Sequence, residues 1–213
     1  IKLNWIKHSQ NLDGFDLIIL PGTKQTIKDL FFLYESGLLK NIQEYSKNNG
    51  NILGICGGLQ MLGEILEDPY LKEGSKDYLK KEINGIGILP LRTIFSKRKN
   101  TRQVITKSSW PCETTINGFE IHNGESDLIF KNKKLKIKPL FKDDNLGWYF
   151  ENDKGGSILG TYIHGIFEND LWRESYIDLI RSKKGLPILD KRIKNYKIKR
   201  DSIIDNLAIQ FNK

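Results

Sequence analysis

The most constraining feature of the sequence is a cysteine between two glycines, placed directly after a short apolar run. The pattern Gly54-x-Cys56-x-Gly58 lies within residues 51–63 and is the thiol form of a nucleophile elbow, in which a strand turns sharply into a helix. Both glycines are needed because a side chain at either position would collide where strand and helix cross. We therefore expect a strand over residues 51–55, a helix from Gly57 and a nucleophilic thiol between them.

The same segment predicts how the thiol is activated. Unpaired N–H groups and the positive end of the helix dipole at the start of a helix favour the thiolate, which is the reactive form of cysteine. A lone cysteine beside a glycine-rich turn is more often a buried structural residue. For Cys56, the two glycines, the apolar strand before them and the helix after them all favour the nucleophile.

The order of apolar runs predicts the rest of the fold. Residues 16–20 and 51–55 are typical of short buried strands, and helix-like spacing of apolar residues covers 26–34, 38–48 and 57–66. This order of strands and helices favours a parallel sheet covered by helices. Further strands are expected over residues 86–91, 102–106, 119–122, 147–150 and 157–162. Two amphipathic helices are expected near residues 170–181 and 201–211.

Length and composition define the class of protein. The chain has 213 residues, of which 38% are hydrophobic and 28% charged, and no linker, repeat or low-complexity tract divides it. We therefore expect residues 1–213 to form one α/β domain. The apolar runs are too short to span a bilayer, and the start of the chain lacks the features of a secretory signal. Because Cys56 and Cys112 make neither a disulfide framework nor a zinc site, we expect a cytoplasmic protein without a metal site.

Positive charge is concentrated in two windows of the sequence. The formal net charge is +8, yet residues 131–142 hold six lysines and no acid, and residues 181–200 hold nine basic residues and one acid. Such windows are either a nucleic-acid footprint, or solvated surface and a face for an acidic partner. Neither window interleaves aromatic residues as a base-stacking platform does, so we expect no nucleic-acid partner. The role of the two windows stays open.

The elbow and its neighbours resemble the class I, triad-type glutamine amidotransferases. The elbow of that superfamily reads Gly-x-Cys-x-Gly-x-Gln, which residues 54–60 match, and a Pro-Gly loop like Pro21-Gly22 precedes it. An ordered set of segments also resembles the amidotransferase part of the cobyric acid synthase family: residues 21–30, 54–63, 68–69, 85–90, 118–124 and 160–167. The resemblance implies a flavodoxin-like, mostly parallel sheet covered by helices.

The resemblance also implies roles for individual residues. Cys56 would attack the side-chain amide of glutamine to give a glutamyl thioester and ammonia, with His164 as the base close to the thiol. Gly22 and Gly57 match the positions whose backbone N–H groups form the oxyanion hole. Gln60 matches the residue that helps to hold the substrate glutamine.

A third member of the triad is not defined by the sequence. Many class I amidotransferases follow the histidine with Pro and Glu, and that Glu orients the imidazole, but neither residue follows His164 here. Glu120 and Glu168 are the candidates for orienting His164, and a Cys–His pair alone is the alternative. His122 is expected either to line the site or to face water from a strand.

The resemblance implies further parts that this chain lacks. Amidating a carboxylate requires its activation, in this family by ATP with Mg²⁺, and the sequence contains no Gly-x-x-x-x-Gly-Lys-Ser/Thr loop. The family carries an N-terminal synthetase domain of dethiobiotin-synthetase type, and the start on Ile1 fits a truncated chain. No cofactor is therefore expected in this domain. The implied reaction amidates carboxylates b, d, e and g of a corrinoid, adenosylcobyrinic acid a,c-diamide, in cobalamin biosynthesis.

Other functions remain open at this level. Cobyrinic acid a,c-diamide synthase and the enzyme pair that amidates the cell-wall lipid precursor use related amidotransferase domains. The segments at residues 68–69 and 85–90 favour the cobyric acid synthase family. A non-catalytic module that binds nucleic acid through the two basic windows would explain the charge but would leave the elbow unexplained.

Overall fold

A five-stranded sheet forms the centre of the computed structural model, which describes residues 1–73, 81–129, 136–143, 145–152, 154–189 and 195–211. In spatial order the strands are β1 (Ile18–Leu20), β2 (Ile52–Ile55), β9 (Ser157–Thr161), β8 (Gly147–Glu151) and β7 (Lys138–Pro139). β1, β2 and β9 pair in parallel, whereas β8 and β7 add antiparallel strands beside β9. The predicted parallel sheet therefore exists as three adjacent strands.

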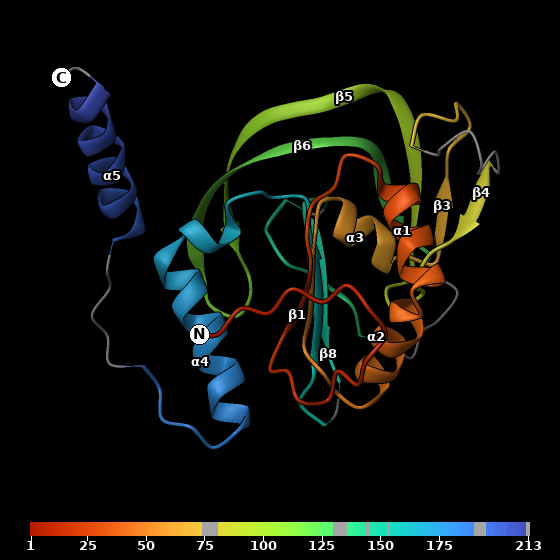
Figure 1. Ribbon diagram of the computed structural model, residues 1–213, viewed down its shortest axis with the longest axis horizontal. Helices are drawn as coiled ribbons and strands as arrows, with labels where there is room; N and C mark the ends of the chain where they lie inside the picture. Colours follow the sequence, from red (N-terminus) through yellow and green to blue (C-terminus); the bar gives the residue numbers. More distant parts are fainter. Residues whose placement is uncertain (74–80, 130–135, 144, 153, 190–194, 212–213) are drawn as a thin grey trace.

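Helices lie on both sides of this sheet. They are α1 (Thr26–Glu35), α2 (Leu38–Lys47), α3 (Gly57–Leu62) and α4 (Asp170–Lys183). Figure 1 shows α1, α2 and α3 on one side of the strands and α4 on the other. The predicted α/β architecture is confirmed by this arrangement.

The two faces of the sheet pack into two separate apolar cores. Ile52 of β2 and Ile158 of β9 belong to the core that includes α1, α2 and α3. Their chain neighbours Leu53 and Leu159 belong to the core that includes α4. Successive residues of a strand point to opposite faces of the sheet. A strand with apolar residues on both faces, as in β2 and β9, therefore belongs to a sheet that is covered on both faces. Each of these fully buried side chains stabilises the fold by about 1.5–3 kcal/mol.

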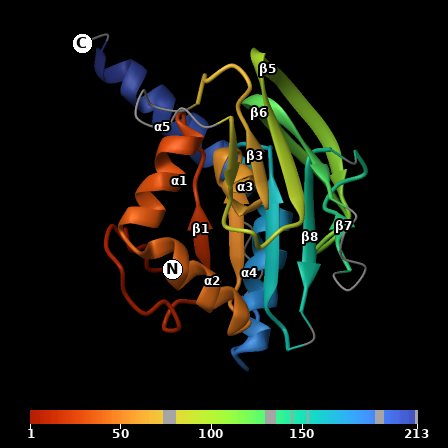
Figure 2. The ribbon, with the colours of Figure 1, turned by 90° about the vertical axis from the view of Figure 1, so that its right-hand side faces the viewer.

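A second sheet of four strands adjoins the first and contains a long hairpin. Its strands, in spatial order, are β4 (Glu82–Asn84), β3 (Ile65–Glu67), β5 (Leu91–Ser108) and β6 (Thr114–Leu128). The hairpin of β5 and β6 arches over the molecule in Figure 1 and lies next to β7 and β8 in Figure 2. Two isolated bridges join the hairpin to segments that follow strands of the first sheet. They pair Ser108 with Phe141, after β7, and Phe119 with His164, after β9.

Several predicted boundaries are wrong. Residues 86–91 do not form a strand before Leu91, because Gly87 has a φ of +74° and N–H groups of the segment donate to carbonyls of Met61 and Leu62. The helix predicted over residues 57–66 ends at Leu62 and the chain continues as β3. The strands predicted over 102–106 and 119–122 are parts of the much longer β5 and β6.

The two C-terminal helices differ in how they pack. α4 buries Trp172, Tyr176 and Ile180 against the sheet, as an amphipathic helix should. α5 (Tyr196–Phe211) begins earlier than predicted, buries none of its residues and projects from the body in Figures 1 and 2. Within the described part of the chain, every helix is too short or too polar to cross a membrane.

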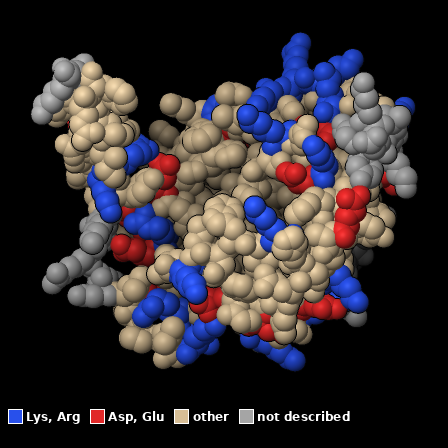
Figure 3. Space-filling model, in the orientation of Figure 1, with Lys and Arg blue, Asp and Glu red and all other residues tan. Residues whose placement is uncertain are grey.

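Basic residues of the window 181–200 are largely at the surface. Figure 3 shows acidic and basic side chains interspersed on one face, with a group of Lys and Arg over β5. Four ion pairs among the described residues involve this window: Lys183 with Glu151, Lys184 with Asp16, and Arg200 with both Glu168 and Asp201. Such pairs contribute little to stability, and they favour the interpretation as solvated surface. Residues 131–135 and 190–194 of the two windows lie outside the described residues.

Candidate active site

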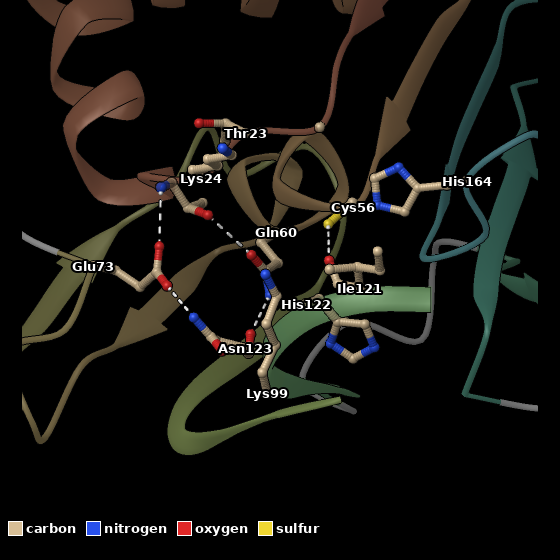
Figure 4. A pocket seen from close by; sticks show the side chains of 12 residues that line it. Thr23, Lys24, Cys56, Gln60, Glu73, Lys99, Ile121, His122, Asn123 and His164 are labelled. Atoms are coloured by element: carbon tan, nitrogen blue, oxygen red, sulfur yellow. Dashed lines mark hydrogen bonds between the residues drawn. The ribbon is translucent and has the colours of Figure 1, made fainter. Parts of the chain in front are cut away.

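Three adjacent parallel strands deliver the central residues of the site to one edge of the sheet. Gly22 follows β1, Cys56 follows β2 and His164 follows β9. Sites in open α/β sheets form at this carboxyl edge. A Cβ atom built on Gly22 would lie 3.0 Å from Cε1 of His164 and 3.6 Å from Cβ of Cys56. The three residues therefore meet, and Figure 4 shows the imidazole of His164 beside the thiol of Cys56.

A cavity of about 360 Å³ opens at this edge. It is lined by Gly22, Thr23, Lys24, Thr26, Cys56, Gln60, Glu73, Lys99, Ile121, His122, Asn123 and His164. Five residues predicted from the sequence to belong to the site are thus brought together: Gly22, Cys56, Gln60, His122 and His164. The other predicted residues, Gly57, Glu120 and Glu168, do not line the cavity.

The backbone around Cys56 has the strained geometry that the sequence predicts. Cys56 has a φ of 53° and a ψ of −110°, in the region where residues other than glycine are rarely found. A Cβ atom on Gly58 would lie 2.0 Å from the carbonyl oxygen of Leu20, and one on Gly54 would lie 2.7 Å from the backbone of Gly58. Both glycines are therefore required by the close crossing of strand and helix, and the predicted elbow is confirmed.

The thiol of Cys56 is held as a neutral group in this structure. Its side chain is buried and donates a hydrogen bond to the carbonyl of Ile121 at 3.3 Å. Burial raises the pKa of Cys56 to about 11, while the N–H of Gly57 and the charge of Lys99 act in the opposite direction. The N–H of Gly57 at the helix start favours the thiolate as predicted, but desolvation has the larger effect, so the net shift is towards the neutral thiol.

His164 is positioned by packing and by its backbone. Its N–H donates to the carbonyl of Phe119 at 2.8 Å, and the two rings stack with centroids 5.1 Å apart. Burial lowers the pKa of His164, and the nearby carbonyl of Ile121 partly offsets this effect. Its Nε2 atom is buried and bonds to no other described residue. A neutral imidazole therefore lies beside a neutral thiol.

The two carboxylates considered for orienting His164 have other partners. Glu120 is buried on β6, where it accepts a hydrogen bond from Arg102 and lies 3.3 Å from Nε2 of His122. Glu168 is exposed and accepts a hydrogen bond of 2.7 Å from Arg200. Neither contacts the His164 ring among the described contacts, so these contacts support neither candidate, and the Cys–His pair stays the alternative.

Gln60 joins three parts of the molecule at the floor of the cavity. Its Oε1 accepts from the hydroxyl of Thr26 at 3.1 Å, and its Nε2 donates to the carbonyl of Asn123 at 2.8 Å and to the hydroxyl of Tyr162 at 3.3 Å. The side chain is almost completely buried. The polar groups of Gln60 are already hydrogen-bonded to the protein. The side chain therefore holds α1, β6 and the chain after β9 together around the cavity.

His122 lines the cavity from β6, as one of its two predicted placements required. Its ring stacks on Tyr162 with centroids 3.8 Å apart, and its Nδ1 lies 2.9 Å from the carbonyl oxygen of Gly124. The hydroxyl of Tyr162 in turn forms a hydrogen bond of 2.6 Å with Oγ of Ser126. Buried polar groups paired in this way fix the position of the ring.

Several lining residues were missed by sequence reasoning. Thr23, Lys24 and Thr26 lie inside the Pro-Gly segment, and Asn123 lies inside the segment 118–124, so the quoted motifs contained a signal for them. Glu73 and Lys99 lie in none of the quoted segments and are brought to the cavity by the tertiary fold. No group of three or more potential metal ligands occurs among the residues that the structure describes.

Comparisons with known proteins agree with this geometry. Residues 1–172 match the family described as CobB/CobQ-like glutamine amidotransferase domain. The cobyric acid synthase of Prochlorococcus marinus strain MIT 9215 is 63% identical over 213 residues, which are 100% of this chain and 42% of that protein. The cobyric acid synthase of strain NATL1A is 46% identical over 213 residues, 100% of this chain and 43% of that protein. The chain thus spans less than half the length of these relatives.

A solved structure of a glutamine amidotransferase has the same fold. The two structures superpose with a TM-score of 0.58 at 13% identity, over 87% of this chain and 88% of the other. A likeness at this identity bears on the fold alone, and it confirms the predicted α/β class. The family match over residues 1–172 and the high identity to the relatives together show more: the chain belongs to the CobB/CobQ-like glutamine amidotransferase family.

Proposed function

We propose that this chain is the glutaminase domain of a cobyric acid synthase and that residues 1–213 act as one unit. In this proposal the chain hydrolyses glutamine and supplies ammonia for amidation. One observation carries the proposal: a buried thiol on a strained elbow lies beside an imidazole in a cavity with space for one amino acid. The relatives' names favour cobyric acid synthase over the other amidating ligases.

The first step is attack of Cys56 on the amide carbon of glutamine. As the bond between sulfur and carbon forms, His164 takes the thiol proton and the carbonyl π electrons move to oxygen. The N–H groups of Gly22 and Gly57 donate to this oxyanion. Each such donor stabilises the transition state by about 3 kcal/mol. The Gly57 N–H already acts on the Cys56 sulfur.

The second step releases ammonia and then glutamate. The bond between carbon and nitrogen breaks, its electron pair goes to nitrogen, and His164 returns its proton, so that ammonia and a glutamyl thioester of Cys56 result. Water then attacks the thioester while His164 takes a proton from it. The bond between carbon and sulfur breaks, the thiolate regains the proton from His164, and glutamate leaves.

The neutral resting pair suits this sequence of proton transfers. Because the pKa of His164 is lowered, its imidazole is unprotonated at neutral pH and can act as a base. Because the pKa of Cys56 is raised to about 11, the thiol loses its proton only together with bond formation. Proton transfer is thus coupled to the arrival of the substrate.

The remaining reactants belong to parts outside this chain. We propose that ATP and Mg²⁺ act in an N-terminal synthetase domain of the same polypeptide, where they activate carboxylates b, d, e and g of adenosylcobyrinic acid a,c-diamide. Ammonia from Cys56 would amidate them, which corresponds to a step of cobalamin biosynthesis in the cytoplasm. The chain length relative to the relatives supports a further domain. In this proposal the chain itself needs no cofactor, no membrane and no nucleic acid.

Replacing the thiol tests the proposal. In the complete polypeptide, Cys56→Ala should lower glutamine hydrolysis by about four orders of magnitude or more, because the nucleophile is lost. Amidation with added ammonia should remain. Cys112→Ala is the matched control and should retain both activities. Glutamate release by a folded Cys56→Ala protein at the wild-type rate would overturn the proposal.

A further inference from the structure

Three charged side chains line the cavity together with the thiol and the imidazole. Glu73, Lys24 and Lys99 are the charged residues among those that line the cavity. Figure 4 shows Glu73 and His164 on opposite sides of the cavity, with Gln60 between them. The proposed chemistry at Cys56 uses none of these three charges, so their presence calls for a separate explanation.

Glu73 is a fixed and nearly buried carboxylate. Glu73 as a whole is only 6% exposed to solvent. Oε2 accepts from the backbone N–H of Thr26 at 3.2 Å, and Oε1 accepts from Nδ2 of Asn123 at 2.8 Å. Its own N–H donates to Oδ2 of Asp68 at 2.7 Å. These bonds hold the carboxylate in one orientation at the cavity wall.

The hydrogen bonds of Glu73 leave room for a further donor. Each carboxylate oxygen has two lone-pair sites, and each Glu73 oxygen uses one of them in the contacts described. Among the described residues, no lysine or arginine forms an ion pair with Glu73. A buried charge that has no counter-ion among the residues around it is costly, and none is found for Glu73 among the described residues. The site is therefore suited to a positively charged group that arrives with a ligand.

Two ammonium groups complete the arrangement. Lys24 belongs to the loop after β1, and Lys99 lies at the irregularity of β5 where the register shifts between Ile94 and Lys99. Within the described part of the chain, neither lysine forms an ion pair. Lys99 is close enough for its charge to act on both Cys56 and His164. The lysines thus offer positive charge to an anion inside the cavity.

We propose that Glu73 binds the α-ammonium group of glutamine and that Lys24 and Lys99 bind its α-carboxylate. The inference rests on the proposed function, since it concerns the same cavity and substrate. Free glutamine is a zwitterion, and its two α-substituents match the signs of these side chains while its amide reaches Cys56. A glutamine residue within a peptide lacks both charges, so the cavity selects the free amino acid.

Substrate analogues that lack one charge test this inference. In the complete polypeptide, kcat/KM for ammonia release is measured with glutamine, with glutaramate, which lacks the α-amino group, and with 4-aminobutanamide, which lacks the carboxylate. Wild-type protein should prefer glutamine over glutaramate by about 10- to 100-fold or more, because a site built for a polar group rejects the analogue without it. Glu73→Gln should lower kcat/KM for glutamine by about 10- to 100-fold and leave that for glutaramate within about threefold.

The lysines give a second arm with a different analogue. Combined Lys24→Met and Lys99→Met should reduce the preference for glutamine over 4-aminobutanamide by about 10-fold or more, and should leave the value for 4-aminobutanamide nearly unchanged. Glu125→Gln, which alters an exposed carboxylate on β6 outside the cavity, is the matched control and should retain every wild-type preference. A ratio of two substrates in one sample is independent of the fraction of folded protein.

The outcomes separate this inference from the proposed function. Alkylation of Cys56 by iodoacetamide, which carries neither charge, should be no slower in Glu73→Gln than in wild-type protein, because the charge of Glu73 raises the pKa of Cys56. If Glu73→Gln lowered kcat/KM equally for glutamine and glutaramate, or abolished ammonia release from both, Glu73 would have a structural role and the inference would be overturned. Unchanged preference would overturn it as well. If wild-type protein released no ammonia from any of the three amides, the proposed function itself would fail.

Discussion

Two regions meet at the cavity and differ in construction: the carboxyl edge of β1, β2 and β9, and the hairpin of β5 and β6. The sheet edge presents Gly22, Cys56 and His164 on short connections directly after buried strands. The hairpin presents Lys99 and Asn123 from long strands whose outer faces are exposed. This difference teaches that the position of the proposed reacting groups depends on local chain geometry, whereas the position of the residues proposed to surround the substrate depends on tertiary pairing.

Direct bonds connect the two regions, and three of them involve a residue of the proposed site. Cys56 donates its thiol hydrogen bond to the carbonyl of Ile121, and Gln60 donates to the carbonyl of Asn123. The backbone of His164 pairs with that of Phe119. Changes at the sheet edge should therefore affect the chemistry, while changes at the hairpin should affect binding and stability.

The two histidines give the largest contrast between the regions. His164→Asn should lower kcat for glutamine hydrolysis by about 10²- to 10⁴-fold, because the base is lost. His122→Asn, the matched change on the hairpin, should lower kcat by less than about tenfold and instead lower the free energy of unfolding by about 1–3 kcal/mol. Glutamate release and urea unfolding measure the two effects. Equal losses of kcat would remove the proposed distinction.

The elbow glycine is expected to have the next largest effect. Gly58→Ala should lower the free energy of unfolding by about 3 kcal/mol or more, because the new Cβ would meet the carbonyl oxygen of Leu20 and the backbone must move. Gly14→Ala has open space around the new Cβ and should change stability by less than about 0.5 kcal/mol. Urea unfolding of both variants measures the two changes in the free energy of unfolding. A Gly58→Ala protein of wild-type stability would contradict the close crossing.

A smaller effect is expected where the floor of the cavity joins the two regions. Tyr162→Phe removes the hydroxyl that bonds Gln60 and Ser126 and should lower the free energy of unfolding by about 1–2 kcal/mol. Tyr34→Phe, at an exposed position on α1, should have no measurable effect. Because the described hydrogen bonds of the Tyr162 hydroxyl are to Gln60 and Ser126 and not to Cys56 or His164, kcat should change less than stability. A larger loss in kcat than in stability would assign Tyr162 to the chemistry.

The smallest expected effect is a displacement of the pH profile. In the proposed mechanism the neutral imidazole of His164 is the active form. Because burial lowers the pKa of His164, kcat/KM should be retained as pH falls through 6.5 and be lost only at lower pH. A profile of kcat/KM against pH measures this acidic limit. An acidic limit above pH 6.5 would contradict the burial of His164.

The sequence predicts the sheet edge better than the hairpin because local signals suffice there. Glycine spacing, an apolar run and a turn define the elbow at Cys56, and β1 and β9 have equally short and apolar sequences. In β5 and β6, polar residues such as Lys99 interrupt the pattern, and pairing over a long register decides the length of the strands. Glu73 has no local signal at all, since its role depends on contacts with Thr26 and Asn123.

The direction of the Cys56 pKa could not be predicted for a related reason. The sequence places the thiol at a helix start, which favours the anion, but burial beneath the hairpin is a tertiary property that has the larger effect. Sequence motifs therefore identify the groups that meet, and they leave the charge state of those groups to the packing around them.

The neutral state of the resting thiol has a consequence for chemical durability. Peroxide oxidation and alkylation begin from the thiolate, and susceptibility follows thiolate character and exposure. With a buried side chain and a pKa raised to about 11, Cys56 presents little of that form between catalytic events. We therefore expect Cys56 to be oxidised more slowly than an ion-paired cysteine, because burial both raises its pKa and shields its side chain.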